Sequence, residues 1–525
     1  MISRKEYFNF KQNFLKEIND FENNIEKEFK QNTGSYYTDI YFINDILIDI
    51  FSLKTLDEFS SMKILEPCVG VGNYIFAILF YLYEHNTNKE IVEKIKNNIY
   101  VVDINKEALN FYKNHLLILL KKLFDIKLLN SENYFNEHIG YNLIFNQYDK
   151  PIKYRSLEDV FPNINFKFDL ILTNPPYKLL KLKANDERKE QIQKINKEMF
   201  KNTDTKTINL FKFFVEEIIN NYAKENAIIS LLIPFSFLKD LSCKKLRTFM
   251  LNKCSIINIK CINEENNIIK ANQSMCNILC KKAKEDNYKF FVFQDYTKSK
   301  NNICITKEQI FFLTPNNEIL TCNNEQLDLV EKLKDFPKIK DFDFIKNLRG
   351  ELDLSIHKDS FSNEKTNYKL IRGRTIQLVE NDNIDINEYV KNDFVLKSKK
   401  ANYIFNPRII CQQIANLNKK KRLQFYYCDK PLVLADSCNF ITIEDNDYKI
   451  DLFFLLAVLN SNIINDYFNI FSSNNHINNY EISNLPIPIK SNKEKISSLY
   501  KNYLSTKNES VLKEIEDEIR KAFQC

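Results

Sequence analysis

Glycine is scarce in this chain. It supplies 6 of the 525 residues, whereas an average usage of roughly 7% would give several times more. This scarcity, beside abundant Asn, Lys and Ile, indicates a compositional bias that removes glycine wherever the backbone tolerates another residue. The positions that keep glycine are therefore informative, and they are Gly34, Gly70, Gly72, Gly140, Gly350 and Gly373.

Long apolar runs and metal-ligand spacings are also missing. The longest apolar stretch, residues 74–83, is far shorter than the roughly 20 residues that cross a bilayer, and residues 1–5 lack the apolar core of a signal peptide. The 12 cysteines form no Cys-x-x-Cys pair and the 5 histidines show no ligand spacing. We therefore expect a cytoplasmic protein with reduced core thiols, no membrane segment and no metal.

Four residues, Asn174-Pro175-Pro176-Tyr177, directly follow the apolar run 168–173. A nearly continuous apolar run predicts a buried strand of a parallel sheet, and two prolines end its ladder because neither donates a backbone hydrogen bond. The turn should therefore lie at the carboxyl end of a strand, where open α/β sheets bind ligands. Its amide and its ring suit a planar substrate with an amino group, although a structural proline turn fits these four residues equally well.

A glycine loop and an acidic residue favour the ligand-binding interpretation. Gly70 and Gly72 lie in the stretch 63–73, which predicts a strand, a tight loop and the start of a helix; glycine there permits positive φ and close approach of the backbone to a ligand. A second strand, residues 98–102, ends in Asp103, a position suited to binding the ribose hydroxyls of a nucleoside cofactor. Helix capping is the alternative for Asp103 alone, but its place after a glycine loop favours the ribose role.

In these elements the chain resembles the gamma-class N6-adenine DNA methyltransferases. Members of that class use S-adenosylmethionine, and their target-recognition segment comes last in the chain. The matching segments are, in chain order, 34–38 (Gly-Ser-Tyr-Tyr-Thr), the glycine loop 66–72, Asp103, the turn 174–177, Asn209-Leu210-Phe211, the strand-and-proline run 227–234 and Leu246-Arg247. Their joint order and spacing carry the resemblance over most of the chain.

The resemblance implies roles for particular residues. It makes Asn174, Pro175, Pro176 and Tyr177 catalytic: the Asn174 oxygen and the Pro175 carbonyl would accept the amino hydrogens of a flipped adenine, and Tyr177 would stack on the base. The residues implied in cofactor binding are Tyr37, Thr38, Glu66, Pro67, Cys68, Gly70, Gly72, Asp103, Ile104 and Asn133, the last in the place of the acid that holds the cofactor's adenine. The second aromatic expected before the strand 275–280 is absent from residues 263–274.

The predicted fold class is α/β. We expect a helical segment at residues 1–31, a Rossmann-like S-adenosylmethionine-dependent methyltransferase sheet at 32–337, and a mixed α+β target-recognition domain at 338–525. Within the catalytic domain, the highly charged residues 178–205 are expected to form a surface loop rather than a packed element.

Basic clusters mark the C-terminal domain, where the predicted DNA contacts are Arg349, Arg372, Arg374, Lys419, Lys420 and Lys421. Two of the rare glycines, Gly350 and Gly373, stand beside these arginines. Arginine is a natural reader of guanine, and glutamines such as Gln412 and Gln413 are natural readers of adenine. A solvated loop is the alternative for any single cluster, and a net charge of +6 permits a DNA partner without requiring one.

We therefore expect a site-specific DNA adenine methyltransferase that acts on double-stranded DNA with S-adenosylmethionine, with a separately encoded restriction endonuclease as an open possibility. One alternative is methylation of RNA or of a protein glutamine. Another is the methylating part of a bifunctional restriction-modification enzyme, although the residues before Asn32 are too few for an upstream nuclease. A non-catalytic DNA-binding relic is the third.

Overall fold

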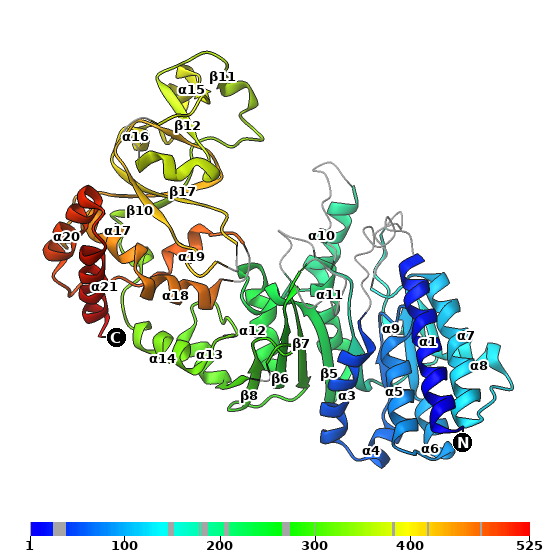
Figure 1. Cartoon of the computed structure of the whole chain (residues 1–525). Helices are drawn as coiled ribbons and strands as arrows, with labels where there is room; N and C mark the ends of the chain where they lie inside the picture. The colour runs from blue at the N-terminus through cyan, green and yellow to red at the C-terminus, as the bar shows by residue number, and fades with distance from the viewer. Residues whose placement is uncertain are drawn as a thin grey trace. The chain divides into compact units, whose positions relative to one another are not determined.

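A computed structural model describes residues 2–24, 38–144, 152–177, 179, 187–203, 209–264, 273–299, 301–380, 384–416, 419–472 and 475–524. The chain divides into two compact units (Figure 1). Unit 1 comprises Met1–Phe311 and Asn316–Thr321, and unit 2 comprises Phe312–Pro315 and Cys322–Cys525.

Unit 1 is built on one sheet, which has nine strands in the described residues. In spatial order they are β3 (Ile139–Tyr141), β2 (Ile99–Asp103), β1 (Ile64–Glu66), β4 (Phe168–Thr173), β5 (Ala223–Pro234), β7 (Met275–Lys281), β6 (Ser255–Ile262), β8 (Lys289–Phe293) and β9 (Asn302–Thr306). The first five run parallel, and β7 is antiparallel to both of its neighbours. The predicted Rossmann-like methyltransferase sheet is confirmed.

Helices cover this sheet. They are α1 (Arg4–Asn24), α3 (Ile40–Leu53), α4 (Leu56–Ser61), α5 (Asn73–Glu84), α6 (Lys89–Lys96), α7 (Lys106–Phe124), α8 (Ser131–His138), α9 (Leu157–Val160), α10 (Glu187–Met199), α11 (Leu210–Glu217), η1 (Ile218–Tyr222), η2 (Phe235–Leu238), η3 (Leu241–Cys243) and α12 (Lys244–Lys253); α13 (Lys307–Leu313) leads from unit 1 into unit 2.

Helix α1 packs against the body of unit 1. The Phe14 ring meets those of Phe76 and Phe80 on α5 and of His115 on α7, at centroid distances of 5.1, 5.5 and 5.3 Å. The described part of the predicted N-terminal segment 1–31 is therefore an integral layer of unit 1 rather than a separate element (Figure 1).

Helix α10 corrects one expectation. It lies within residues 178–205, which the high charge predicted to be a surface loop. Ile192 is fully buried and Asn196 is nearly so, and Glu187 and Glu190 occupy its first turn, where carboxylates stabilise a helix through its dipole. One narrow buried stripe is enough to hold this charge-rich segment as a packed helix.

Unit 2 combines two four-stranded sheets with helices, which confirms the predicted mixed α+β class. The first sheet has the order β10 (Ile345–Arg349), β17 (Cys438–Ile443), β14 (Arg408–Gln412), β15 (Phe425–Cys428); the second has β11 (Phe361–Ser362), β13 (Tyr389–Val390), β12 (Tyr368–Ile371), β16 (Val433–Leu434). The helices are α14 (Asn324–Leu333), η5 (Ile339–Asp341), η6 (Lys358–Ser360), η7 (Gly373–Glu380), α15 (Asn392–Lys397), α16 (Ala401–Ile404), α17 (Leu452–Asn460), α18 (Asn462–Phe471), α19 (Asn479–Ser483), α20 (Lys493–Thr506) and α21 (Glu509–Phe523).

The boundary between the two units lies earlier in the chain than the boundary predicted at 337/338. Helix α14 belongs to unit 2 and packs against α18. The Phe336 ring meets Phe523 on α21 at a centroid distance of 5.0 Å. These tertiary contacts place the segment before Pro337 in the C-terminal unit.

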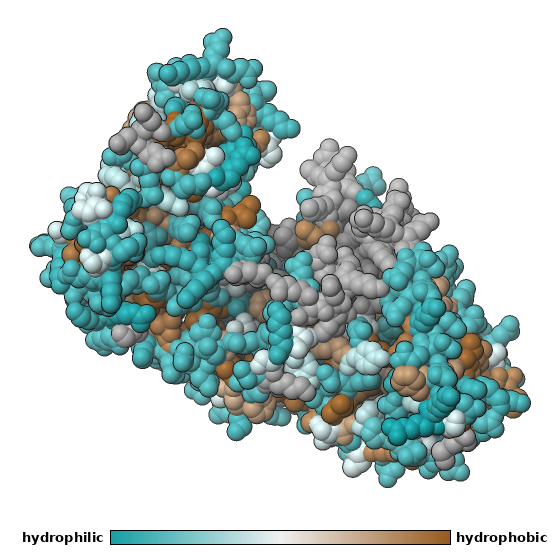
Figure 2. All heavy atoms as spheres, viewed as in Figure 1, coloured by the Kyte–Doolittle hydropathy of each residue, from teal (hydrophilic) through white to brown (hydrophobic). Residues whose placement is uncertain are grey.

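The described surface is mainly polar. Figure 2 shows hydrophilic residues over most of the visible face, interrupted by small hydrophobic areas. Exposed large apolar side chains such as Phe8, Leu129 and Leu396 come from separate elements. Within the described ranges, no helix is long and apolar enough to span a membrane, and no group of three or more His, Cys, Asp and Glu side chains could hold a metal ion.

A buried ion pair joins the two sheets of unit 2. The side chains of Glu351 and Arg408 are both 0% exposed. The Arg408 guanidinium donates to the Glu351 carboxylate and to the Leu432 carbonyl, and the other Glu351 oxygen accepts from the backbone N–H of Leu434 at 2.7 Å. Leu434 lies in β16 and Arg408 in β14, so one carboxylate holds an element of each sheet.

We predict that Glu351→Ala lowers the free energy of unfolding by about 3–5 kcal/mol, because it leaves the Arg408 charge buried without its partner. Urea unfolding followed by circular dichroism measures this loss. Glu494→Ala is the control, because its pair with Lys449 is exposed and should leave the midpoint unchanged. Equal midpoints for the two variants would refute the importance of the buried pair.

Candidate functional site

The carboxyl ends of β1, β2 and β4 lie at one edge of the sheet, because these strands are parallel and adjacent. The chain order reverses between β1 and β4, which makes this edge the topological switch point where open α/β sheets bind ligands. The glycine loop follows β1, Asp103 ends β2, and the Asn174 turn follows β4. The structure therefore brings the three predicted elements together.

The glycine loop needs both of its glycines. Gly70 and Gly72 have φ values of 53° and 104°, in the left-handed region that favours glycine. A Cβ atom on Gly72 would also overlap the Tyr112 ring. The backbone N–H of Val69 donates to the Val102 carbonyl at 2.9 Å, which holds the loop against β2.

Asp103 anchors this loop rather than capping the following helix. Its Oδ2 accepts from the Gly70 N–H at 2.7 Å, and its Oδ1 accepts from the Asn105 N–H at 2.7 Å. The cap of α7 is Asn105, whose side chain accepts from Glu107. Burial raises the pKa of Asp103, against the lowering effect of the hydrogen bonds from Asn105 and Gly70.

Glu66 is the second carboxyl at this edge and is 2% exposed. Its Oε2 has no hydrogen-bond partner among the described residues. Burial raises the pKa of Glu66 well above its ordinary value, and the neighbouring Asp103 raises it further. A buried carboxyl oxygen without a partner is costly, so this position is suited to a ligand that brings a hydrogen-bond donor or a positive charge.

The remaining predicted loop residues flank these carboxyls. Pro67 is buried and Cys68 is partly buried directly after Glu66, while Ile104 is partly buried directly after Asp103. Burial raises the pKa of the Cys68 thiol well above its ordinary value, and the Asp103 carboxyl raises it further. Cys68 is therefore held as a neutral thiol.

The turn after β4 contacts Thr38. The Asn174 Nδ2 donates to the Thr38 Oγ1 at 2.9 Å, and the Tyr177 hydroxyl donates to the Asn174 Oδ1. Tyr177 is 7% exposed, so in this state its ring is largely packed inside rather than presented to a stacked base. Tyr37, predicted beside Thr38, lies outside the described residues.

The structure does not bring Asn133 to this edge. Asn133 is exposed on α8, the helix that leads into β3. On the same helix, the Tyr134 hydroxyl donates to the Lys96 carbonyl at 3.0 Å, and the His138 Nδ1 lies 2.9 Å from the Ile99 oxygen. Both contacts lie where β2 begins, so α8 is at the opposite edge from Asp103.

Asn142 occupies the place that sequence reasoning gave to Asn133. It directly follows the carboxyl end of β3, has a φ of 62° and is 7% exposed. Its N–H donates to the Asp103 carbonyl at 3.1 Å. The signal that could have identified it is its position after a strand, since the other residues at this edge, Glu66, Asp103 and Asn174, also stand at or directly after strand ends.

An aromatic ring also leaves the neighbouring strand β5 near the turn. Thr173 pairs with Leu231, and Tyr177 and Phe235 each stand four residues further along the chain, past the ends of β4 and β5. Phe235 is partly buried, and its N–H donates to the Ser274 carbonyl at 3.0 Å. This ring differs from the aromatic expected just before β7, because it follows β5.

Helix α1 reaches the site through Glu22. The Asn73 Nδ2, at the start of α5, lies 3.1 Å from the Glu22 Oε1 and 2.9 Å from the Thr38 carbonyl oxygen. Glu22 and Asn73 are 6% and 8% exposed. A sequence signal existed: Glu22 continues the buried stripe of Phe14 and Ile18 at four-residue spacing, where an apolar residue would be expected.

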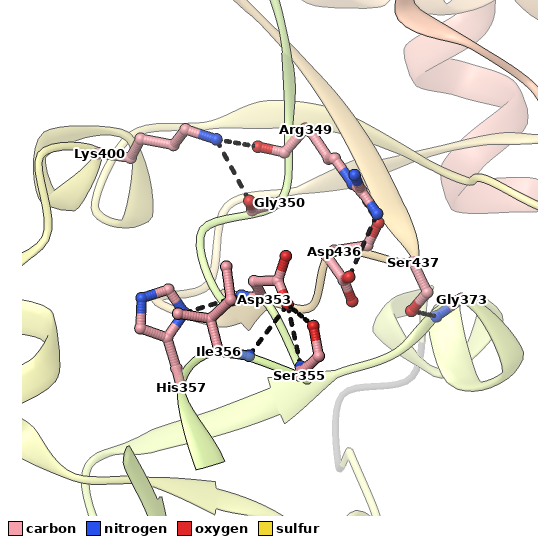
Figure 3. A network of polar contacts seen from close by, with 10 residues as sticks. All are labelled: Arg349, Gly350, Asp353, Ser355, Ile356, His357, Gly373, Lys400, Asp436 and Ser437. Carbon is pink, nitrogen blue, oxygen red and sulfur yellow. Dashed lines mark hydrogen bonds and ion pairs between the residues drawn. The ribbon is translucent and has the colours of Figure 1, made fainter. Parts of the chain in front are cut away.

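The predicted DNA-contact residues of unit 2 gather at one sheet edge. Arg349 ends β10 and Gln412 ends β14, and both strands are antiparallel to the β17 that lies between them. Arg349 donates from Nε to the Asp436 carbonyl at 2.7 Å and pairs with the Asp436 carboxylate at 3.2 Å (Figure 3). The turn between β16 and β17 thus holds this arginine.

The two glycines beside the arginines pack against that same turn. A Cβ on Gly350 would overlap the Ala435 carbonyl, and one on Gly373 would lie 2.7 Å from the Ser437 oxygen. The Gly373 N–H donates to the Ser437 Oγ at 3.0 Å (Figure 3). Both glycines are therefore required by close backbone approach, which brings the Arg372–Arg374 segment beside the Arg349 edge.

One carboxylate binds the other two arginines. Glu388 pairs with the Arg372 Nε at 2.5 Å and with the Arg374 guanidinium at 3.3 Å, and the Arg374 side chain is 73% exposed. Sequence reasoning missed Glu388 and Asp436 because both lie far from their arginines in the chain.

The lysine cluster follows β14 at the same edge. Lys419 and Lys420 are exposed and Lys421 is partly buried. The Asn465 side chain on α18 donates to the Lys420 carbonyl at 2.8 Å and accepts from the Arg422 N–H at 2.8 Å. The backbone of this cluster is therefore anchored while two of its charges face solvent.

Comparison with known families covers both units. The Eco57I restriction-modification methylase family matches residues 97–269, which include Asp103 and the Asn174 turn. The TaqI-like C-terminal specificity domain matches residues 368–487, which include Arg372, Arg374 and the lysine cluster. Residues 97–269 are therefore similar to a restriction-modification methylase, and residues 368–487 are similar to a C-terminal specificity domain.

Individual relatives are more distant. The Type II methyltransferase M.BsuBI of Bacillus subtilis is 25% identical over 227 residues, which is 43% of this chain but only 38% of that protein. The solved structure of the Type IIL restriction-modification enzyme MmeI in complex with DNA has a TM-score of 0.55 and 12% identity, covering 95% of this chain and 77% of that one. A DrdV–DNA complex has a TM-score of 0.56 and 11% identity, covering 92% and 58%. These structural likenesses establish the fold.

The raised pKa of Glu66 predicts a pH-dependent stability. The folded protein keeps this proton where the unfolded chain has lost it, so stability is lost as the pH rises from the ordinary value of 4.5 through the raised folded value. Glu66→Gln removes that loss. Without ligand, the difference in thermal stability between the variant and the unsubstituted protein should increase in favour of the variant as the pH rises from about 5 to about 8.

Thermal unfolding monitored by circular dichroism measures this difference. Glu285→Gln, in an exposed turn, is the control and should follow the unsubstituted protein at both pH values. If the melting temperature of Glu66→Gln changed with pH in parallel with that of the unsubstituted protein, the prediction of a buried, protonated Glu66 carboxyl would be contradicted.

Proposed function

We propose that this chain is a site-specific DNA adenine methyltransferase that transfers a methyl group from S-adenosylmethionine to N6 of an adenine extruded from duplex DNA. The observation that carries the proposal is the Asn174–Tyr177 turn at the same strand-end edge as the glycine loop and Asp103. The TaqI-like specificity domain in the same chain supports DNA rather than RNA or a protein glutamine as substrate. The methylation would protect or mark host DNA.

The residues at this edge fit the cofactor. S-adenosylmethionine, when bound, supplies an electrophilic methyl group on a positively charged sulfonium. The buried Glu66 oxygen would accept from a cationic or hydroxyl-bearing ligand, and Asp103, next to it, would accept from the ribose hydroxyls. The positive φ values at Gly70 and Gly72 leave the backbone open to close approach. Asn142, rather than Asn133, is placed to bind at the adjoining end of β3.

Asn174 prepares the substrate amine for attack. The exocyclic nitrogen of adenine is a weak nucleophile because its lone pair is delocalised into the ring. Acceptance of its two hydrogens by the Asn174 Oδ1 and the Pro175 carbonyl favours a pyramidal nitrogen with a localised lone pair. The carboxamide oxygen has two lone pairs, so it can accept a substrate hydrogen as well as the Tyr177 hydroxyl. Transfer would form the nitrogen–methyl bond and break the sulfur–methyl bond, so that S-adenosylhomocysteine would leave as a neutral thioether and the nitrogen would shed one proton to water.

Two rings flank the proposed base position. Tyr177 lies in the turn after β4, and Phe235 directly follows the adjacent parallel strand β5, so the two rings would both contact one extruded base. Stacking is worth about 1–3 kcal/mol per base, comparable with the few kcal/mol needed to extrude it. Because Tyr177 is buried in this state, entry of the base requires movement of its ring.

Substitutions at the two strand ends should separate catalysis from cofactor binding. Asn174→Ala should lower kcat by about 10²–10³-fold, because it removes an acceptor that acts on the reacting amine, while the Kd of S-adenosylhomocysteine stays close to that of the unsubstituted protein. Asp103→Ala should raise that Kd at least about tenfold, by losing a hydrogen-bonded carboxylate. Calorimetry and transfer of tritiated methyl to duplex DNA, followed by nucleoside mass spectrometry, measure both effects.

The outcomes divide the alternatives. Methylation of duplex DNA at a base other than adenine would refute the N6 assignment. Transfer to structured RNA or to a protein glutamine, with none to duplex DNA, would refute DNA as the substrate. Absence of S-adenosylhomocysteine binding would indicate a non-catalytic DNA-binding relic.

The lysine cluster should contribute to DNA affinity through its phosphate contacts. Replacing Lys419 and Lys420 together by Gln should lower the slope of log K against log salt concentration by about 2 in duplex binding. Lys449→Gln is the control, because Lys449 follows the other end of β17, away from Asp436. Fluorescence anisotropy at several salt concentrations measures the slope. An unaltered slope for the double variant would indicate that the cluster is a solvated loop without phosphate contacts.

A further inference from the structure

Four residues connect helix α1 to the turn after β4. The Asn73 Nδ2 donates to the Glu22 Oε1 and to the Thr38 carbonyl oxygen, at 3.1 and 2.9 Å, and the Thr38 Oγ1 accepts from the Asn174 Nδ2 at 2.9 Å. Three of the four, Glu22, Thr38 and Asn73, are at most 8% exposed. These contacts join segments far apart in the chain.

The Thr38 contact distinguishes the two ends of the Asn174 carboxamide. An asparagine side chain can be rotated by half a turn with little steric change, which exchanges its donor and acceptor ends. The Thr38 hydroxyl accepts from the NH2 end. The oxygen end, which accepts from the Tyr177 hydroxyl, then lies on the other side of the carboxamide, where its second lone pair can accept an amino hydrogen.

Glu22 and Asn73 in turn fix Thr38. The same Asn73 amino group that holds the Thr38 backbone is held by the Glu22 carboxylate, and hydrogen bonds to a carboxylate are stronger than those between neutral groups. Asn73 follows Gly72 directly and begins α5, so the anchor of Thr38 is adjacent to the glycine loop. A shift of α1 or of the loop would therefore be transmitted to Asn174.

We propose that Glu22, Asn73 and Thr38 are positioning residues that orient the Asn174 carboxamide with its oxygen toward the reacting amine. The expected effect on kcat rests on the proposed function, whereas the expected orientation of the Asn174 side chain rests on the hydrogen bonds alone. All three residues also lie outside the matched methylase segment 97–269.

Thr38→Val tests the proposal because it removes the acceptor while keeping the shape. At saturating DNA and cofactor, kcat should fall by about 10²-fold, the cost expected for a misplaced catalytic group, whereas Thr38→Ser should stay within about threefold of the unsubstituted protein. Glu22→Leu should lower kcat by about tenfold and Glu22→Gln, which keeps an acceptor oxygen, should restore it. Thermal unfolding verifies that each variant is folded.

A ligand-free crystal structure of the Thr38→Val protein supplies a readout independent of activity. The Asn174 side chain should leave the position that it occupies beside residue 38. An unchanged kcat for Thr38→Val, or an unmoved Asn174 in its crystal structure, would overturn the proposal. If the unsubstituted protein shows no methyl transfer, the proposed function fails, and the crystallographic comparison still decides whether Thr38 orients Asn174.

Discussion

The parallel direction of β1, β2 and β4 is the constraint on which the site depends. Parallel neighbours end at the same edge of a sheet, so Glu66, Asp103 and Asn174 meet although they are far apart in the chain. Each strand is short and mostly buried, and a turn follows its last residue. An antiparallel β4 would move Asn174 to the opposite edge and separate the amide from the glycine loop.

That edge gathers groups that are unfavourable without a ligand. Two neighbouring carboxyls have raised pKa values because burial disfavours their charged forms, and Asp103 adds to the effect at Glu66. Such clusters are typical of functional sites, where stability is exchanged for binding. Unit 2 has the contrasting arrangement, since the Arg372 and Arg374 guanidiniums are already paired with Glu388.

Sequence reasoning reached those features that depend on local chemistry. Apolar runs, prolines and rare glycines locate the strand ends, and hence the glycine loop, Asp103 and the Asn174 turn. Features set by distant contacts were beyond it. Asn133 resembles a binding residue in the sequence, but packing places its helix before β3. Glu22 meets Asn73 only in the folded chain, and contacts such as that between Phe336 and Phe523 join the residues before Pro337 to unit 2.

A crystal structure with S-adenosylhomocysteine and a duplex oligonucleotide tests the central claim most directly. The account predicts the ribose hydroxyls on the Asp103 carboxylate, the sulfur near the Asn174 turn, and an extruded adenine whose amino group contacts the Asn174 oxygen. A cofactor bound away from the ends of β1 and β2, or an Asn174 turn closed off from its sulfur, would contradict it.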